Sequence, residues 1–530
     1  MFSSTHPKYR SMWTAVLGVL AIAAVGLMLG STRSGPEVND DSILYVAAAR
    51  NLLDGRGFSW LSGGGEVRPI TGFPPAYSVL IAAVGLTGMD LFEGARIINA
   101  ALFGLSAFLA GLLILQGTNS GPAALLGALL IAGNADLLLV HRWIMAEALF
   151  ITLLLLSIFL LSAYLAAPRK SLALLSGLAI ALAMLTRYAG VGLLPGAILG
   201  MGLLSVAGWR KRLEDCLLAA AVAALPFGIL TLVNYSITGS AYHREALFEA
   251  PQYSTLVSYL NAAFSWFVPI APDASIRLRW KVLILFSLLL VAPLLLYVRA
   301  RRSRTGGTSR SLPGSATIPP LASFLSLAYL LVLAGTISSG DLGPLHLQRY
   351  VAPVFASWVV LTITVVHQVA WNRRGGWAVK LFTVALAVAF LGWYGKEGFH
   401  FLQDNAAGPL TDEYKRDNGK TVQKLQRLDP SETLYTNEIY LLYYLTYRSA
   451  YQVPMLEDGS MEGAEEDPSS QLSVFRRKMA EGAYLILFDS IDYQEGMFPS
   501  REVLSRGLVP LEKIARGKIY VDPEAHPVTP

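Results

Sequence analysis

Long apolar runs, each bounded by polar or charged residues, recur along residues 1–395. A helix that crosses the hydrocarbon core of a bilayer needs about 20 apolar residues, and most of these runs approach that length. Together they predict a polytopic α-helical membrane protein with about 11 transmembrane helices. The predicted spans lie near residues 12–30, 95–115, 121–140, 144–166, 171–186, 188–206, 214–233, 281–298, 320–337, 350–370 and 377–394.

One further apolar run, residues 73–88, begins with Pro74-Pro75. It is about 16 residues long, short for a span, so we expect it to lie at the interface or to re-enter the membrane. Five basic segments favour 11 spans without residues 73–88. All five segments are cytoplasmic only if an even number of crossings separates each pair. Twelve spans with one misplaced basic segment remain the alternative. The basic segments are Lys8 with Arg10, 169–170, 210–212, 299–304 and 373–374.

This topology predicts a cytoplasmic N-terminus and an extracytoplasmic C-terminal region. We divide the chain into a transmembrane domain, residues 1–395, and an extracytoplasmic soluble domain, residues 396–530. Two loops of the transmembrane domain, residues 31–94 and 234–280, lie on the outer side. In the C-terminal domain, helix-like stretches at 418–428 and 471–482 alternate with short apolar strands at 432–436 and 483–488, which predicts an α/β fold.

Composition supports the membrane assignment and excludes other classes. The 530 residues are 54% hydrophobic and only 15% charged, which excludes a soluble enzyme, a fibre and a disulfide scaffold. Residues 396–530 carry 15 Lys or Arg against 22 Asp or Glu, so the net charge of +5 comes from the loops of the membrane part and predicts no nucleic-acid partner. The single cysteine, Cys216, allows neither an intrachain disulfide nor a zinc cluster built on thiolates.

Two adjacent carboxylates, Asp40 and Asp41, follow the first span at the outer face, where they begin a short predicted helix. Capping of the helix N-terminus explains one aspartate. The second has no structural assignment, and a carboxylate at this place can serve as a general base.

Other charged residues gather at the same predicted face. Glu147 begins a span, where the helix dipole stabilises a carboxylate. Arg187 and Arg349 lie beside spans, and each alone is explained as an arginine whose charged end reaches the interface. Both lie outside against the positive-inside trend, however, which indicates an anionic partner. For His141, close by, we prefer an interfacial structural role.

Short motifs occur in a specific order along the chain. They are DDSILY at 40–45, LLDGRGF at 52–58, PPAY at 74–77, MAEALF at 145–150, LTRY at 185–188, QRYVAP at 348–353 and YTN at 435–437. This order resembles the GT-C superfamily of integral membrane glycosyltransferases, and most of all the group that contains protein O-mannosyltransferases and lipid A aminoarabinose transferases. The resemblance covers most of the chain and implies a GT-C-like catalytic domain.

The resemblance also implies a substrate class: a sugar moved from a polyprenyl-phosphate donor to a hydroxyl on a glycan, lipid or protein at the outer face of the cell membrane. Asp41 is the expected base, since its spacing from Tyr45 fits the family, and Asp40 stays a candidate because the family usually shows Asp-Glu here. One base without a nucleophilic carboxylate predicts inversion at the anomeric carbon. Glu147 orients the acceptor, an arginine or a divalent metal ion; the sequence shows no dedicated metal site.

Further residues receive roles from the same resemblance. Arg187 and Arg349 are expected to hold the donor phosphate, with contributions from Tyr350 and Arg142. The substrate pocket is expected to include Tyr45, Tyr77 and Tyr188.

Two other classes stay open. A transporter or flippase of a lipid-linked substrate also has many spans and intramembrane charges, but such proteins place ionisable residues near the midplane, often in paired repeats. A receptor or scaffold acting through the acidic tail leaves the ordered motifs of the membrane part unexplained.

Overall fold

The computed structural model describes residues 7–240, 266, 284, 287–288, 290–294, 316–338, 347–372, 376–404, 419–455, 468–489 and 498–526. Across this described part, the chain divides into two compact units. The first contains residues 1–33, 71–81 and 92–406, and the second contains residues 34–70, 82–91 and 407–530.

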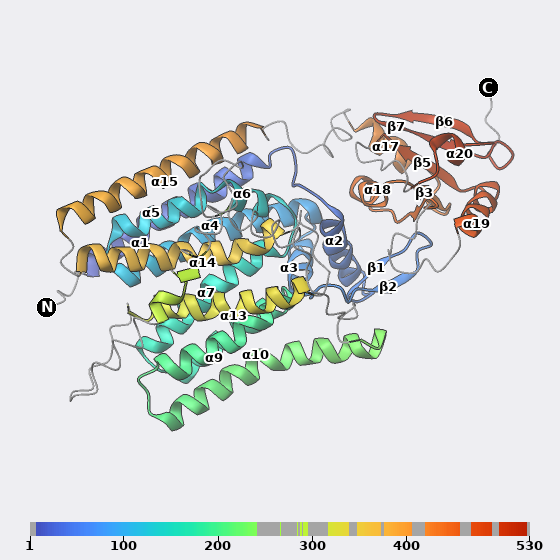
Figure 1. Ribbon diagram of the computed structural model, residues 1–530. Coiled ribbons are helices and arrows are strands. Elements are labelled where there is room, and N and C mark those ends of the chain that lie inside the picture. The colour runs from blue at the N-terminus through green and yellow to red at the C-terminus, as the bar shows by residue number, and fades with distance from the viewer. Residues whose placement is uncertain are drawn as a thin grey trace. The chain divides into compact units, whose positions relative to one another are not determined.

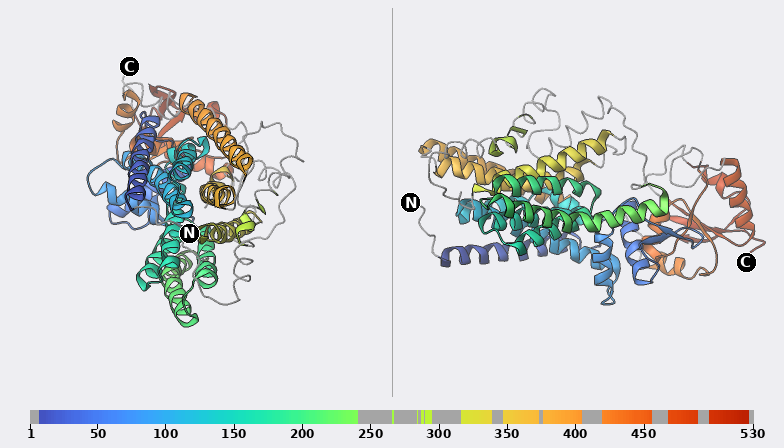
Figure 2. Two further views of the ribbon diagram at one scale, coloured as in Figure 1. Left: turned by 90° about the vertical axis from the view of Figure 1, so that its left-hand side faces the viewer. Right: turned by 90° about the horizontal axis from the view of Figure 1, so that it is seen from below.

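The first unit is helical, and its long helices run side by side (Figures 1 and 2). A short helix, α3 (Ala76–Gly85), connects it with the second unit along the chain. The other elements are α1 (Pro7–Ser31), α4 (Leu91–Thr118), α5 (Gly121–Ala132), α6 (Ala135–Arg142), α7 (Glu147–Ala166), α8 (Lys170–Met184), the 3-10 turn η1 (Tyr188–Gly192), α9 (Leu193–Leu204), α10 (Trp209–Thr238), α13 (Ile318–Ser338), α14 (Leu347–His367), the π-helical turn η4 (Gln368–Asn372) and α15 (Trp377–Asp404).

Within the described residues, seven helices are long and apolar enough to cross a membrane, and α5 with α6 makes an eighth if the bent pair is one span. The chain is therefore a multi-pass membrane protein. The predicted count of 11 is not confirmed, because α8 and α9 have only 15 and 12 residues. Most of the predicted span at 281–298 and most of the predicted outer loop 234–280 lie outside the described residues.

Two deviations from straight spans have local causes. The predicted span 121–140 bends by 56° between α5 and α6, where Gly133 ends one helix and the Asn134 side chain caps the next by accepting from Leu137 N at 2.8 Å. The α3 helix has 10 residues and is about 15 Å long, half the thickness of the hydrocarbon core. This length agrees with the expectation that residues 73–88 do not cross.

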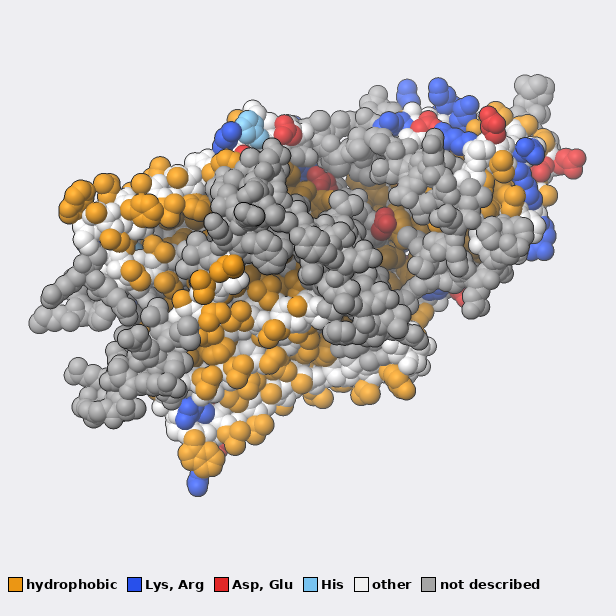
Figure 3. All heavy atoms as spheres, viewed as in Figure 1, with side chains coloured by type: hydrophobic (Ala, Val, Ile, Leu, Met, Phe, Trp, Pro, Cys, Tyr) orange, Lys and Arg blue, Asp and Glu red, His pale blue; other side chains and the backbone are white. Residues whose placement is uncertain are grey.

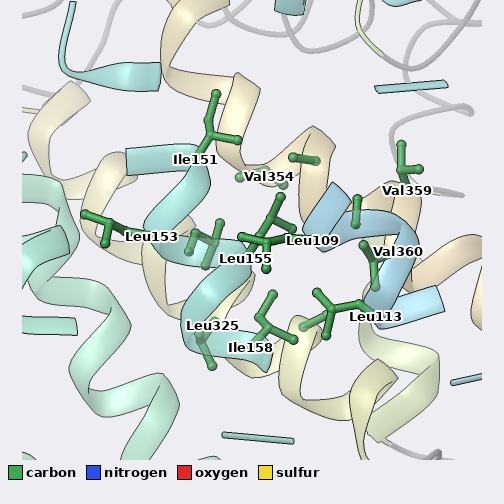
Figure 4. Close-up of a cluster of buried hydrophobic side chains, with 14 of the residues drawn as sticks. Leu109, Leu113, Ile151, Leu153, Leu155, Ile158, Leu325, Val354, Val359 and Val360 are labelled. Carbon is green, nitrogen blue, oxygen red and sulfur yellow. The ribbon is translucent and has the colours of Figure 1, made fainter. Parts of the chain in front are cut away.

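The core of the first unit lies where α4, α7, α13 and α14 meet (Figure 4). Leu113, Ile158, Leu325 and Val360 have no exposed surface there. Helices surrounded by lipid gain no hydrophobic driving force from pairing, so close packing holds them together. By contrast, apolar side chains of α10 and α15, such as Leu232 (70% exposed), face outward (Figure 3), as lipid contact requires.

One end of the first unit collects basic segments. Tyr9 of α1 accepts a hydrogen bond from Gly121 N at 3.2 Å, and Ser162 of α7 donates to Gln116 of α4 at 3.3 Å. The Nζ of Lys170, at the beginning of α8, lies 4.0 Å from the Oε2 of Glu214, near the beginning of α10. Three of the five basic segments thus share one end within the described part of the unit. The other two, 299–304 and 373–374, lie outside it. Which end is cytoplasmic stays a prediction.

The second unit contains the predicted α/β domain. The described strands of this domain form a five-stranded sheet in the order β4-β3-β5-β7-β6. Strand β3 is parallel to β4 and β5, and β7 is antiparallel to β5 and β6. The predicted strands at 432–436 and 483–488 and the predicted helices are present. The elements are α17 (Lys420–Gln426), β3 (Leu434–Thr436), α18 (Ile439–Thr446), β4 (Tyr451–Gln452), α19 (Pro468–Ala480), β5 (Tyr484–Phe488), α20 (Arg501–Leu504), β6 (Val509–Ile514) and β7 (Gly517–Val521).

Part of the predicted first outer loop belongs to this second unit. Helix α2 (Asp40–Leu53) and the antiparallel hairpin of β1 (Ser59–Leu61) and β2 (Val67–Pro69) group with the C-terminal sheet. The sequence did not suggest this grouping, since almost 400 residues separate the two segments, as between Arg50 and its partner Tyr447.

Candidate active site

Three helix ends in the first unit present charged residues that the sequence analysis singled out. Glu147 is the first residue of α7, and Arg349 lies in the first turn of α14. Arg187 follows α8 in an extended conformation (φ −148°, ψ 137°). The end of α8 is fixed there, because the Leu185 carbonyl accepts a hydrogen bond from Ala76 N at 2.9 Å. The sequence placed these three residues at one face, and the structure brings them into contact.

Glu147 forms ion pairs with both arginines. Its Oε1 pairs with Arg187 Nη1, and Arg349 Nε lies 3.4 Å from the same oxygen. The carboxylate side chain is 3% exposed, and those of the arginines are 12% and 16% exposed. A buried charge without a partner is strongly unfavourable, so these pairs stabilise one another. Of the roles expected for Glu147, the geometry fits orientation of the arginines.

Tyr350 supports both arginines with its ring. The guanidinium carbon of Arg187 lies 4.6 Å from the ring centroid, and that of Arg349 lies 5.1 Å away. Arg349 Nη2 also donates to the Tyr350 hydroxyl at 3.2 Å. The Tyr350 carbonyl accepts a hydrogen bond from Tyr329 of α13 at 2.9 Å. Sequence reasoning did not identify this second tyrosine, which belongs to none of the motifs.

The cluster of Glu147, Arg187 and Arg349 keeps a net charge of +1. A partly desolvated positive site favours an anion, and paired guanidinium groups match the oxygens of a phosphate well. The Tyr350 ring holds the guanidinium groups of Arg187 and Arg349 in place, which limits the side-chain entropy that is lost when an anion binds.

Tyr77 lies beneath the turn that precedes Glu147. It has no exposed surface, and its hydroxyl donates to Asn99 Oδ1 at 2.8 Å. Asn99 Nδ2 in turn donates to the carbonyl of Trp143 at 2.6 Å. This chain supports the turn at residues 143–146 and so the start of α7. Sequence reasoning missed Asn99, because a buried asparagine inside an apolar helix carries no motif of its own.

Tyr188, next to Arg187, is held by two hydrogen bonds. Its hydroxyl donates to the Thr71 carbonyl at 2.7 Å and accepts from Asn234 Nδ2 at 2.8 Å. These contacts fix the segment that carries Arg187, and they give a structural role to Asn234, which sequence reasoning did not identify.

The end of α6 holds two more polar residues, Arg142 and His141. Arg142 is 1% exposed, and its guanidinium lies over the Phe401 ring at 5.3 Å from the centroid. His141 has its Nδ1 2.8 Å from the Leu137 carbonyl and its ring against Phe103. The surroundings of His141 fit the structural role that we preferred for it.

Asp40, Asp41 and Tyr45 lie on α2 in the second unit. Helix α2 is capped by Asn39, whose Oδ1 accepts from Ser42 N at 2.9 Å, while Ser42 Oγ accepts from Asn39 N at 3.2 Å. The expectation that an aspartate caps this helix is therefore wrong. Both carboxylates occupy the first turn, where the helix dipole favours a negative charge. Desolvation, with a smaller contribution from the Asp41 charge, raises the pKa of Asp40. Tyr45 is buried, with 6% of its surface exposed.

No group of three or more His, Cys, Asp or Glu side chains in the described part of the chain is arranged to hold a metal ion.

The chain has the GT-C fold, which is the fold of solved integral membrane glycosyltransferases. ArnT from Cupriavidus metallidurans in the apo state matches with a TM-score of 0.56 and 14% identity over 97% of this chain and 98% of that chain. The same protein bound to undecaprenyl phosphate matches with a TM-score of 0.51 and 13% identity over 96% and 98%.

A more distant protein has the same fold. The archaeal oligosaccharyltransferase AglB from Archaeoglobus fulgidus, in complex with an inhibitory peptide and a dolichol-phosphate, matches with a TM-score of 0.51 and 12% identity over 91% of this chain and 70% of that chain. No protein-family model matches the sequence, and comparison with curated proteins finds no match.

Proposed function

We propose that this protein is a glycosyltransferase that moves a hexosyl or pentosyl group from a polyprenyl-phosphate donor to a hydroxyl acceptor at the outer face of the membrane. One observation carries the proposal: Glu147 holds Arg187 and Arg349 against Tyr350 in a chain with the GT-C fold. The orientation that accompanies it is a cytoplasmic N-terminus and an extracytoplasmic C-terminal domain.

The arginine pair supports the assignment of the donor. Two solved proteins of this fold are complexes with undecaprenyl phosphate or dolichol-phosphate, both of which are lipid monophosphates. In our proposal, Arg187 and Arg349 bind the phosphate oxygens, with Tyr350 and Arg142 contributing to the site. The acceptor is a glycan, a lipid or a protein.

The transfer needs one base and a stabilised leaving group. The acceptor oxygen attacks the anomeric carbon while a carboxylate takes its proton, and the bond from the anomeric carbon to the phosphate oxygen breaks with its electron pair. The released phosphate gains one negative charge, which the arginines stabilise. Attack opposite the leaving group inverts the configuration at the anomeric carbon.

Asp41 is the proposed base, with Asp40 as the alternative. Since Asn39 caps α2, neither carboxylate is needed as the cap. The raised pKa of Asp40 makes its carboxylate a stronger base than an ordinary aspartate and keeps it a candidate. Tyr45, Tyr77 and Tyr188 shape the substrate pocket in this proposal, the last two by supporting the residues around the charged cluster.

The test is turnover in nanodiscs with a panel of polyprenyl-monophosphate sugars and membrane extracts as the source of acceptors, measured as released polyprenyl phosphate. We expect release with at least one donor. Asp41→Asn should lower the rate by at least about a hundredfold, while the matched variant Asp40→Asn stays active. The opposite pattern would make Asp40 the base, and no release with any donor would contradict the proposed function.

A further inference from the structure

Tyr447 stands where three distant segments of the second unit meet. It follows α18 of the C-terminal sheet domain, and its partners lie on α2 and in the loop before α4. All three segments belong to one compact unit. Its contacts therefore join the C-terminal domain to the helix that carries Asp40 and Asp41.

The backbone of Tyr447 has an uncommon conformation for a tyrosine. The residue ends α18 with φ 58° and ψ 17°, and its N–H donates to the Tyr443 carbonyl at 2.7 Å. Glycine is favoured at this left-handed position after a helix, because a side chain there is strained. A tyrosine in its place indicates that the side chain has a use that offsets the strain.

The side chain and carbonyl of Tyr447 hold two partners. Its hydroxyl donates to Asp90 Oδ2 at 2.6 Å. The guanidinium of Arg50, in the last turn of α2, lies 4.9 Å from the ring centroid, and its Nη1 donates to the Tyr447 carbonyl at 3.3 Å. An arginine that both stacks and donates in this way is held in one orientation.

A second contact joins the same elements. The β1–β2 turn packs so closely on Tyr451 of β4 that a Cβ atom on Gly63 would lie 2.4 Å from the Tyr451 nitrogen, and one on Gly64 would lie 2.2 Å from its hydroxyl. The hairpin is tied to α2 by Asn51, whose Nδ2 donates to Ser59 at 3.1 Å. The C-terminal domain thus contacts the last turn of α2 directly and through the hairpin.

We propose that the C-terminal domain positions α2, the helix that carries the proposed general base, and that Tyr447 and Arg50 are the positioning residues. Arg50 lies nine residues after Asp41 on one helix, about 14 Å along its axis, so a helix fixed at one end fixes the other. The assignment of a base to α2 rests on the proposed function; the contacts that fix α2 do not. Small displacements of a catalytic group lower the rate strongly without weakening substrate binding.

The first test needs no substrate. Hydrogen exchange of the full-length protein in nanodiscs is compared among the wild type, Tyr447→Phe and Tyr520→Phe, a control on β7 that packs on the core of the same domain. Tyr447→Phe keeps the ring but loses the hydrogen bond to Asp90. We expect exchange at residues 43–53 to rise about tenfold in Tyr447→Phe only, with β5 unchanged as proof that the domain is folded. Unchanged exchange of α2 in both Tyr447→Phe and Tyr447→Ala would overturn the proposal.

The second test separates positioning from stability. Tyr447→Phe should lower kcat about ten- to a hundredfold and leave the KM for the donor unchanged. Asp90→Ala should behave in the same way, whereas Asp90→Asn keeps an acceptor oxygen and should retain most of the rate. A KM effect without a kcat effect would contradict positioning. If the wild type is inactive with every donor, the glycosyltransferase assignment fails, and the exchange experiment alone decides whether the domain fixes α2.

Discussion

At the scale of single residues, Glu147 is the anion that allows two arginines to share a site. Both guanidinium groups contact its Oε1 and both lie against Tyr350. The sequence predicted all four residues, because each belongs to a recognisable motif at a span end. It did not predict their supports, Asn99 and Tyr329, because one polar atom in an apolar helix gives no pattern.

Replacing Glu147 should reveal the positive charge of the cluster. Glu147→Gln leaves two partly buried arginines without their carboxylate, so we expect it to destabilise the protein by about 3 kcal/mol. An anion bound between the arginines replaces the lost charge. Polyprenyl phosphate should therefore raise the melting temperature more in Glu147→Gln than in the wild type, measured by thermal unfolding in nanodiscs.

A matched control for this variant is Glu93→Gln. Glu93 pairs with Arg96 at 2.5 Å, but its side chain is 43% exposed, so the change should cost no more than about 1 kcal/mol. The lipid phosphate should not restore that loss. If it stabilised Glu147→Gln no more than the wild type, the arginine pair would not be the anion site.

At the scale of elements, small residues set the distance between the helices that support the site. A Cβ atom on Gly192, at the end of η1, would lie 2.7 Å from the Ala328 carbonyl oxygen and 3.0 Å from the Tyr329 Cα of α13. The same tyrosine bonds the Tyr350 carbonyl. The packing of η1 on α13 therefore acts on the charged cluster through Tyr329.

Gly192→Ala should push α13 away and destabilise the protein by about 1–3 kcal/mol, with a parallel loss of turnover. The matched control is Gly202→Ala in α9, where a Cβ atom meets nothing within 4 Å. That change should stabilise the helix by about 0.5–1 kcal/mol. Thermal unfolding of both variants is the measurement, and shifts of the same sign would contradict this account of the packing.

The sequence predicted most elements but not how each one ends. Apolar length was sufficient for the long helices, such as α4, α7 and α14, and a short continuous apolar run was sufficient for β5. The sequence did not predict the 56° bend within 121–140, where Gly133 ends α5 and Asn134 caps α6. The sequence also did not predict the cap of α2. Asn39 is the cap, and not an aspartate, because Asn39 and Ser42 form reciprocal hydrogen bonds.

At the scale of the whole molecule, the predicted boundary at residue 395 is a division along the chain, whereas the two compact units are divisions in space. The second unit takes α2 and the β1–β2 hairpin from the first outer loop and joins them to the C-terminal sheet. Hydropathy reports which segments leave the membrane but not which of them pair with one another. The contacts of Tyr447, Arg50 and Asp90 are pairings of this kind.

The most direct test of the central claim is a cryo-electron microscopy structure of the protein in nanodiscs with polyprenyl phosphate. We predict that the lipid phosphate lies within about 3 Å of guanidinium nitrogens of Arg187 and Arg349, the distance of a charge-assisted hydrogen bond. The double variant Arg187→Ala and Arg349→Ala should lose that density. A phosphate bound elsewhere in the wild type, with both arginines still paired to Glu147 and not to the lipid, would contradict the account.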